Sequence, residues 1–287
     1  MEPHLIQNTP EWLSFRKNYI GASDAPIIMG CSIWRTRYQL WKDKIGIGDP
    51  QPMSNAMQRG VDMEESARDW FVYTTGIKIC PEVVLHPDIP YLMASIDGIS
   101  ADLQTIVEIK CPGRQDHSIA KNGTVPAKYY PQLQHQIEVC GVQQAYYLSY
   151  DGKDGVLLTV QRDDEYIEDM LEQHADFWEC VNSFKAPDLC DRDYINRDDD
   201  IWLAMACDWN IIQNQMNNLK LRENELRESF STMSGGKSCV GGGVKVSSVV
   251  RKGHVDYSAI PELTGVDLEK YRKSPTEFIK ITATLPF

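Results

Sequence analysis

Apolar residues recur along this chain with two different periods, and each period predicts one type of element. Steps of three and four residues predict helices, whereas alternation of apolar and polar residues predicts strands. Helices are expected after the cap residue Thr9, in a short segment ending at Gly30, at residues 35–45, 54–75 and 131–140, after Asp163, and at 201–230. Strands are expected at residues 82–86, 91–96, 99–101, 104–110, 145–150 and 156–161. This order of elements predicts a mixed α/β sheet with helices on its faces.

The helix predicted at residues 54–75 has an acidic residue on its apolar side. Its inward stripe consists of Met57, Val61, Glu64, Ala67 or Arg68, and Phe71. A carboxylate among apolar side chains needs a partner, because isolated buried charge is costly. Glu64 is therefore expected either to pair with a core arginine or to point at a functional site. The second alternative is favoured by a group of charged residues further along the chain.

The pattern changes after Asp163, where two long amphipathic helices predict an antiparallel helical arm. The stripe of the second helix includes Ala206, Trp209, Ile212, Met216, Leu219, Leu226 and Phe230. A glycine-rich link then leads into a small, basic, β-rich tail. An arm, a subunit contact and a dock for another protein are all open as roles for these segments. The division expected from the sequence is a core at residues 1–186, an acidic connection and arm at 187–233, and a tail at 234–287.

Two neighbouring strands of the predicted sheet deliver charged residues that suit a reaction centre. Asp97 is expected to leave one strand at a turn formed by Gly98, and the following strand contains Glu108 and Lys110. Residues two positions apart on a strand point to the same face, so Glu108 and Lys110 project together. Ile109 between them turns the other way, into the core. The alternative is an ordinary exposed ion pair between Glu108 and Lys110 on an edge strand.

Two carboxylates and an ammonium on one rim suit a divalent metal ion, an attacking water and a negatively charged substrate. Asp97 and Glu108 are hard oxygen donors of the kind that Mg²⁺ or Mn²⁺ takes. The backbone carbonyl of Ile109 adds another oxygen, and Glu64 completes the set directly or through water. Lys110 would orient the water and stabilise charge on a scissile phosphate. The hypothesis that follows is a site that cleaves phosphodiester bonds, with one or two metal ions.

Net charge, cysteine spacing and the length of the apolar runs add to this picture. The net charge of −12 does not support a polyanionic partner, but it is concentrated in residues 151–200, which hold 5 basic and 16 acidic side chains. The eight cysteines are scattered without a Cys-x-x-Cys pair, which argues against a zinc ribbon or disulfide framework and favours a reducing cytoplasm. No apolar run reaches the length of a membrane span, and the first ten residues lack a signal-peptide pattern.

Several segments resemble one known family in their order and spacing. These segments are residues 12–16, 20–23, 60–64, 94–98, 108–112 and 129–134. Over about residues 1–185 the chain resembles the PD-(D/E)XK nucleases and, within them, the YqaJ-type viral recombinases that include the phage lambda exonuclease. Ile96 stands where the family usually has proline, at a position without chemistry. The resemblance implies a restriction-endonuclease-like α/β core, in which helices flank a mixed central sheet.

The resemblance also implies a role for each matching residue. The implied catalytic residues are Glu64, Asp97, Glu108, Lys110 and Gln132. Asp97 and Glu108 would be the metal ligands, Lys110 the catalytic lysine and Glu64 the carboxylate from the helix. Gln132 would support the site, and Tyr129 lies beside it.

Family members that digest duplex ends hold the 5′-phosphate in a pocket of arginine and serine. The positions that match this pocket are Arg16, Ser23 and Ser95. Arg114 is a weaker match, because the loop after Pro112 differs in length. Arginine suits the task because its planar guanidinium grips a phosphate with two hydrogen bonds.

The function implied by the resemblance is a Mg²⁺-dependent 5′-to-3′ exonuclease acting on linear double-stranded DNA ends. It would leave 3′ single-stranded overhangs for a single-strand annealing recombinase, and it would form a ring-shaped homo-oligomer. A phage- or prophage-encoded protein of this kind would work in the bacterial cytoplasm, away from membranes. The alternatives are another PD-(D/E)XK nuclease, such as an endonuclease or repair nuclease, and a non-catalytic module that binds DNA ends. The intact set of Asp97, Glu108 and Lys110 argues against the binding module.

Overall fold

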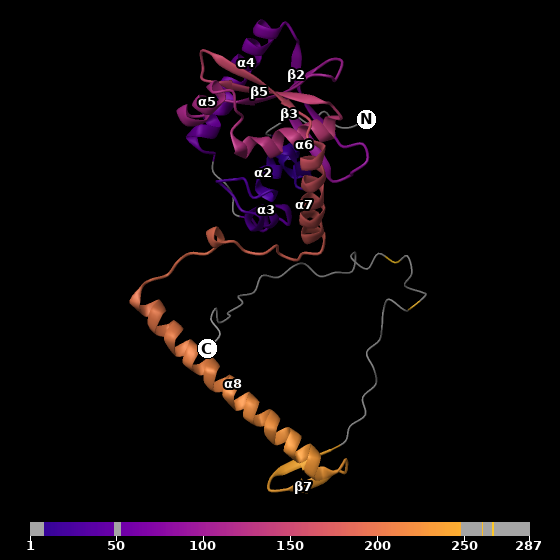
Figure 1. Ribbon diagram of the computed structural model, residues 1–287, viewed down its shortest axis with the longest axis vertical. Helices are drawn as coiled ribbons and strands as arrows, with labels where there is room; N and C mark the ends of the chain where they lie inside the picture. Colours follow the sequence, from indigo (N-terminus) through magenta and orange to yellow (C-terminus); the bar gives the residue numbers. More distant parts are fainter. Residues whose placement is uncertain (1–8, 49–52, 248–259, 261–265, 267–287) are drawn as a thin grey trace. The chain divides into compact units, whose positions relative to one another are not determined.

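The alternating apolar segments of the first part of the chain form one six-stranded mixed sheet with helices on both faces (Figure 1). The computed structural model describes residues 9–48 and 53–247 together with 260 and 266. The chain divides into two compact units, Met1–Ile195 and Asn196–Phe287. The strands of the sheet are β1 (Ile20–Gly21), β2 (Ile79–Leu85), β3 (Leu92–Ser100), β4 (Ile106–Lys110), β5 (Gln144–Tyr150) and β6 (Gly155–Gln161).

Several helices of the first unit begin at a residue whose side chain caps the first turn. They are α1 (Pro10–Arg16), α2 (Ala25–Ile28), α3 (Arg37–Lys44), α4 (Asn55–Thr75), α5 (Arg114–Lys121), α6 (Tyr130–Cys140) and α7 (Asp164–Asn182). The Thr9 hydroxyl accepts a hydrogen bond from the N–H of Trp12 at 3.3 Å, and Asp163 accepts from Tyr166 at 3.1 Å. These bonds satisfy amide groups that the first turn of a helix leaves without a partner. Both predicted caps are therefore confirmed.

Strand β3 organises the sheet because two strands share one of its edges. β2 pairs antiparallel with the other edge along the length of β3. On the shared edge, β1 runs parallel beside Leu92 and Met93, while β4 runs antiparallel beside Gly98 and Ile99. The stretch of β3 between these two pairings is left open. Beyond β4, the sheet continues through a parallel pairing with β5 and an antiparallel pairing of β5 with β6.

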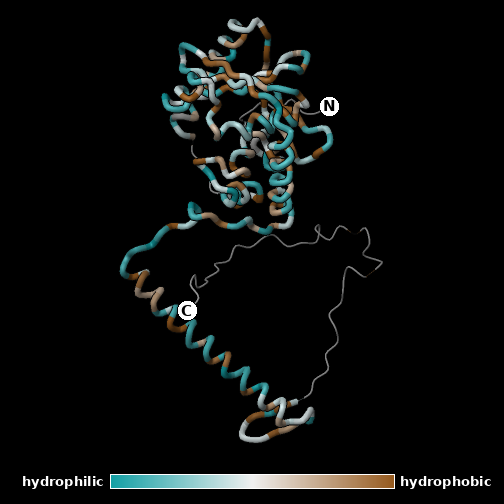
Figure 2. Tube along the Cα trace, viewed as in Figure 1, coloured by the Kyte–Doolittle hydropathy of each residue, from teal (hydrophilic) through white to brown (hydrophobic). Residues whose placement is uncertain are grey.

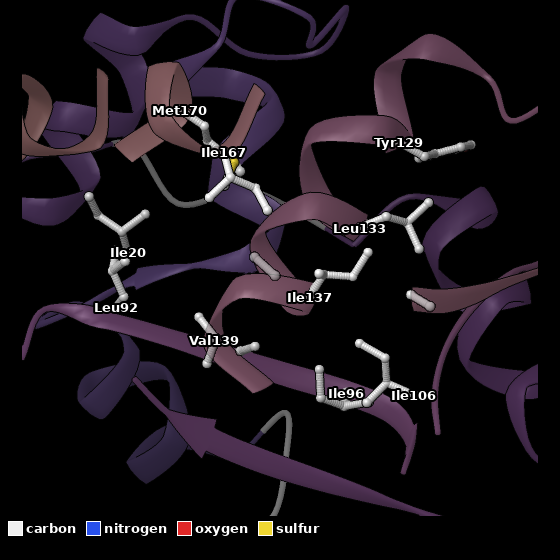
Figure 3. Packing of buried hydrophobic residues seen from close by; sticks show 14 of the residues in the cluster. Ile20, Leu92, Ile96, Ile106, Tyr129, Leu133, Ile137, Val139, Ile167 and Met170 are labelled. Carbon is white, nitrogen blue, oxygen red and sulfur yellow. The ribbon is translucent and has the colours of Figure 1, made fainter. Parts of the chain in front are cut away.

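Two apolar cores hold the helices onto the sheet. The larger core joins the sheet to α2, α3, α6 and α7; in Figure 3, Leu133 and Ile137 of α6 lie near Ile96 and Ile106 of the sheet. Each of these four side chains is at most 1% exposed, and burying a side chain of this size contributes roughly 1.5–3 kcal/mol. The smaller core lies between α4 and the sheet and consists of Ala67, Phe71, Val107, Ile109, Leu148 and Tyr150.

The structure corrects the expected turn at Asp97. β3 runs without interruption from Leu92 to Ser100, so Asp97 lies inside a strand and not at its end. Gly98 instead lies close to β2: a Cβ at this position would lie 2.3 Å from Cδ1 of Ile79, so a larger residue would force Ile79 to shift. The turn follows β3, where Leu103 has a φ of 61°. Asp97 therefore lies in a continuous strand, between Ile96, which pairs with β2, and Gly98, which pairs with β4, where the register with β2 shifts.

The apolar stripe predicted for α4 is buried only in its second half. Ala67 and Phe71 are fully buried, whereas Met57 and Val61 are 56% and 47% exposed. The first half of α4 extends beyond the sheet and instead borders a cleft, with Met57 and Val61 among the lining residues. The 3.6-residue period thus located the helix correctly but did not show where its buried face ends.

The two long helices expected after Asp163 fall in different units. α7 buries Ile167, Met170, His174 and Phe177 and packs on α2, α3 and α6, so the first unit already covers its apolar face. The second unit contains α8 (Asp200–Ser234) followed by the antiparallel pair β7 (Cys239–Gly241) and β8 (Val244–Val246). The strands predicted further along the tail lie outside the described residues. None of the described helices has both the length and the hydrophobicity to cross a membrane.

Two histidines pack against each other in the larger core. The rings of His135 and His174 lie 5.1 Å apart, and both side chains are buried. Nε2 of His135 donates to the carbonyl of Met93 at 2.9 Å, whereas neither ring nitrogen of His174 has a hydrogen-bond partner among the described residues. Burial lowers the pKa of His135 to about 4, and it lowers the pKa of His174 well below its usual value. Both rings are therefore neutral in the folded protein.

We expect the free energy of unfolding to fall as the pH drops from 6.5, the ordinary histidine pKa, toward about 4. The unfolded chain takes up protons in this range that the folded chain excludes, so the stabilisation is complete above the unfolded pKa and is lost toward the folded one. His174→Phe keeps a flat ring without the titrating group and should weaken this pH dependence. Urea unfolding at pH 7.5 and pH 5 measures it. An unchanged pH dependence in the variant would contradict the assignment.

Candidate active site

The three charged residues predicted for the reaction centre meet beside the open edge of β3. Asp97 lies on β3, and Glu108 and Lys110 lie on the neighbouring strand β4. The side chains of Glu108 and Lys110 form an ion pair, as their shared face of the strand requires. The N–H of Ile109 donates to Oδ2 of Asp97 at 2.8 Å. Strand pairing thus positions both carboxylates and the ammonium through rigid backbone.

Glu108 is held by two glutamines of α6. Its Oε1 accepts a hydrogen bond from Nε2 of Gln132 at 2.6 Å, and its Oε2 accepts one from Nε2 of Gln136, one helical turn further along. Glu108 is 1% exposed, and β4 lies between β3 and β5 in the sheet. This excludes the alternative of an exposed ion pair on an edge strand. Sequence reasoning identified Gln132 but missed Gln136, although their spacing of four places both on one helix face.

The pKa of Asp97 is raised well above its usual value. Burial is the largest cause, followed by the negative charge of Glu108, with a smaller contribution from Glu64. Lys110 acts in the opposite direction but does not compensate for these effects. The centre therefore holds more negative charge than its own cation neutralises, and a bound divalent cation would remove this imbalance.

Glu64 has an arginine partner and also influences the centre. Its Oε1 accepts from Nη2 of Arg68 at 2.6 Å, and Nε of the same arginine donates to the backbone carbonyl of Asp97 at 3.0 Å. The sequence left two alternatives for Glu64, a salt bridge and a site carboxylate. Its salt bridge forms with Arg68, and its charge also contributes to the raised pKa of Asp97. Arg68 was missed as the link between α4 and β3.

The donor atoms of the site are oxygens, which is the element that a hard divalent cation prefers. Asp97 and Glu108 offer carboxylate oxygens, and the peptide carbonyl of Ile109 is the neighbouring backbone donor. In the described parts of the chain, however, no three histidine, cysteine or acidic side chains are gathered in an arrangement that could hold a metal ion. Glu64 is turned toward Arg68, and Glu108 is engaged by Lys110 and the glutamines. A cation that uses Glu108 competes with these contacts.

Lys110 is a cation at every physiological pH. Burial opposes its charge, but Glu108 and Asp97 outweigh burial and raise the pKa of the ammonium above its usual value. Its Nζ lies 5.4 Å from the ring centre of Tyr129, which is itself stacked on Tyr147. Burial raises the pKa of Tyr129 to about 12, so its hydroxyl stays protonated. Lys110 therefore suits charge stabilisation and not proton abstraction.

Arg16 is positioned by a buried acid that sequence reasoning did not identify. Its Nη2 donates to the hydroxyl of Ser23 and, at 3.1 Å, to Oδ1 of Asp24. The other oxygen of Asp24 accepts from Nζ of Lys44 at 2.7 Å and from the N–H of Gly21 at 2.9 Å. Burial acts against the ionised carboxyl, but the two cations outweigh it and hold the pKa of Asp24 well below its usual range. The side chain of Arg16 remains 28% exposed and available to an anion.

A small cavity of about 140 Å³ connects the two groups of predicted residues. Its lining includes Arg16, Ser23, Ser95, Asp97, Glu108, Lys110 and Gln132. The cavity is bordered by Gly21 of β1, by β3 and by β4, which is where β1 and β4 separate along the open edge of β3. The residues predicted to bind the 5′-phosphate and the acid–lysine centre therefore line one space.

A larger cleft of about 1310 Å³ adjoins the same residues. Ser23, Asp97, Lys110 and Gln132 line both spaces. Glu64, the backbone donor Ile109 and Tyr129 line only the larger cleft. Arg114 is exposed at the start of α5 and lines neither space.

The fold and the arrangement of the site define a class of protein. The structure is similar to that of an alkaline exonuclease from Laribacter hongkongensis, with a TM-score of 0.54 and 27% sequence identity over 62% of this chain and 94% of that one. The structure of this exonuclease, LHK-Exo, in complex with dAMP gives a TM-score of 0.55 at the same identity. The mixed sheet, with its acid on β3 and Glu-x-Lys on β4, is the core of the PD-(D/E)XK nuclease fold, as the sequence predicted.

Sequence comparison gives a match to one domain family. Residues 11–143 match the YqaJ-like viral recombinase domain, and this segment contains every site residue predicted from the sequence. This match confirms the resemblance predicted from the sequence. The YqaJ protein of Bacillus subtilis (strain 168) is 29% identical over 174 residues, or 58% of this chain. The chain spans about half the length of that relative, with 54% of it covered.

Proposed function

We propose that this protein is a Mg²⁺-dependent exonuclease that degrades the 5′-ended strand of linear double-stranded DNA. The observation that carries this proposal is the small cavity, which Arg16 and Ser23 line together with Asp97, Glu108 and Lys110. An arginine that grips a terminal phosphate there would bring the adjacent phosphodiester bond to the acid–lysine centre. The match to the YqaJ-like domain and the similarity to an alkaline exonuclease support the same reaction class.

The residues of the site have separate roles in the proposed hydrolysis. Asp97, Glu108 and the carbonyl of Ile109 are the groups that would hold the cation. When bound, Mg²⁺ or Mn²⁺ supplies a Lewis acid and lowers the pKa of an attacking water. Lys110 stabilises the charge that develops on the scissile phosphate, because its ammonium is preorganised in a buried site. Gln132 and Gln136 keep the Glu108 carboxylate in one orientation through the reaction.

The larger cleft is the expected path of the duplex toward this centre. Its lining includes exposed Trp34, whose ring centre lies 4.7 Å from Nζ of Lys128. Lys128 also forms an ion pair with Asp116 at 2.7 Å, so a DNA phosphate would exchange with a carboxylate at this position. Such exchange allows the cleft to receive a polyanion in a chain whose net charge is −12. The same competition predicts binding that weakens as salt concentration rises.

The proposed biological role is the one that the family resemblance implies, in phage recombination. The 3′ overhang left by the enzyme would pass to a single-strand annealing recombinase of the same phage or prophage. A ring-shaped homo-oligomer around the duplex would keep the enzyme on its substrate in the bacterial cytoplasm.

Degradation of linear duplex DNA carrying strand-specific end labels tests the proposed activity directly. We expect the 5′-ended strand to be lost from each end with Mg²⁺ or Mn²⁺ present, and no loss in EDTA. Closed circular DNA should stay intact. Equal cutting of circles and linear duplexes would identify an endonuclease instead, and binding of ends without cleavage would identify a non-catalytic module.

Arg16→Ala is expected to remove the preference for a 5′-phosphate over a 5′-hydroxyl end. Hydrogen bonds to charged groups contribute about 1.5–3 kcal/mol, which corresponds to roughly a 10- to 100-fold preference. Rates on two duplexes that differ only in the 5′ group measure it. Arg114→Ala is the matched control, because this second predicted arginine lies outside the cavity and should leave the preference unchanged. A preference that survives Arg16→Ala would refute the role of Arg16.

A further inference from the structure

α8 has an apolar stripe with the spacing of a coiled coil. From Trp202 to Met233, stripe positions follow each other at alternating steps of three and four residues, and Glu223 is the single charged residue among them. The positions are Trp202, Met205, Trp209, Ile212, Met216, Leu219, Glu223, Leu226, Phe230 and Met233. Their mean spacing is about 3.4 residues, close to the 3.5 of a coiled coil, and the seven-residue repeat is sustained over more than four heptads. A strict repeat of this length is typical of helices that wind around each other.

This stripe is exposed in the second unit. Its apolar residues range from 37% exposed at Trp209 and Phe230 to 81% at Met233, and α8 contains no buried residue. Figure 2 shows hydrophobic positions recurring along the whole length of α8. The other large apolar residues of α8 are Ile201, Leu203, Ile211 and Leu221, which fall at four different heptad positions and form no second stripe. Soluble monomers rarely expose a continuous apolar surface of this kind.

The partner that fits the stripe is another helix with the same repeat. The other long helices of the described residues are α4 and α7. α7 buries its apolar face against α2, α3 and α6, and α4 packs on the sheet through Ala67 and Phe71. Among the described helices, α8 alone has the seven-residue repeat over this length. A second copy of α8 therefore supplies the matching surface.

Glu223 indicates the direction in which two copies pair. Arg222 precedes it at the position that flanks the seam, and Arg227 donates to Oε1 of Glu223 at 2.6 Å. In a parallel pair in register, each Glu223 lies beside Arg222 of the other chain, so arginines from both chains surround the two carboxylates. In an antiparallel pair with fully overlapping stripes, Glu223 faces residues 208–216, which contain no basic side chain. A single polar residue on a seam is a recognised device for setting register.

We propose that α8 pairs with α8 of a second copy of this chain as a parallel, in-register coiled coil. The interface joins the nuclease domains of two copies through their C-terminal units. The heptad repeat, the exposure of the stripe and the charges around Glu223 support this pairing. It does not depend on the proposed nuclease activity.

Disulfide trapping in the full-length chain tests this pairing. Met205→Cys introduces a thiol on the stripe, where the parallel register places the two copies of residue 205 together. Leu203→Cys is the matched control, because it is two residues away, off the stripe and similarly exposed, at 53% against 67%. Both variants also have Cys207→Ser, which removes a nearby exposed thiol. We expect mild oxidation to link most chains of the Met205→Cys protein in pairs and to leave the Leu203→Cys protein near background.

A second pair of variants tests whether the stripe drives the association. Ile212→Asp with Leu219→Asp places two charges on the stripe and should abolish both the trapped pair and the corresponding mass by light scattering. Ile211→Asp with Leu221→Asp makes the same chemical change off the stripe and should retain both. Equal trapping at positions 203 and 205, or trapping that survives the stripe charges, would overturn the proposal. A monomeric chain whose α8 amides resist hydrogen exchange would also overturn it, because residues 248–287 would then cover the stripe.

Discussion

A Lys110→Ala variant is expected to hydrolyse linear duplex DNA at least about 100-fold more slowly than the wild type, because one preorganised charge donor contributes about 10²–10³ in rate. The Lys110 ammonium keeps its proton because Glu108 and Asp97 outweigh the effect of burial. The Glu108 carboxylate that loses its ion pair is still held by Gln132 and Gln136, so the fold should persist. Single-turnover cleavage of end-labelled duplex measures the rate, and a binding assay without metal measures affinity, which should be nearly unchanged.

Lys121→Ala provides the control for this experiment. Lys121 is an exposed lysine in the last turn of α5, outside both spaces of the site, so its removal lowers the net charge equally without touching the centre. It should cleave DNA at the wild-type rate. Unchanged cleavage by the Lys110→Ala protein would remove Lys110 from the mechanism.

Asp97→Asn is expected to abolish hydrolysis and, at the same time, to raise the melting temperature. The variant loses a charged oxygen donor for the cation, but its amide oxygen can still accept from the N–H of Ile109. The folded pKa of Asp97 lies above its usual 3.8, so its contribution to stability is complete at low pH and is lost as the pH rises through the folded value. Above the folded pKa, the ionised carboxylate is therefore destabilising. Its neutral replacement should add roughly 2–4 °C for each kcal/mol of repulsion removed.

Thermal unfolding with and without Mg²⁺ distinguishes this explanation from a general effect of removing an acid. Mg²⁺ should raise the melting temperature of the wild type, because it offsets the same excess charge, and should have little effect on Asp97→Asn. Asp102→Asn is the matched control, since hydrogen bonds from Ser100 and the N–H of Gln104 lower the pKa of this exposed acid. It should not gain stability. A lower melting temperature for Asp97→Asn than for the wild type would contradict the charge imbalance.

The elements and the shared face of Glu108 and Lys110 could be predicted because they depend on short stretches of backbone. The caps at Thr9 and Asp163 involve residues three positions apart, and Glu108 and Lys110 are two positions apart on one strand. Such relations follow from the repeat of the helix and the strand alone. The seven-residue repeat of α8 is of the same kind and is present in the sequence without any reference to a partner.

The misplaced turn and the missed residues have a common origin in contacts between distant segments. The strand through Asp97 continues because β2 pairs along it, and Gly98 lies close to Ile79 of that strand. Asp24 ties Arg16 to Lys44, which lies twenty residues further along the chain. Gln136 reaches Glu108 from a different helix. A short sequence pattern cannot show contacts between residues that are this far apart in the chain.

The sequence by itself determined the chemical groups of this protein, their order and their match to the YqaJ-like viral recombinase domain, because these properties depend on residue identity and spacing. Only the tertiary structure decided how the charges are shared. In the folded protein, Glu108 is buried on an interior strand and Glu64 forms an ion pair with Arg68. Arg16 and Lys110 line one cavity. The physical reason is that partner choice and pKa depend on burial and on separations in space, which packing sets.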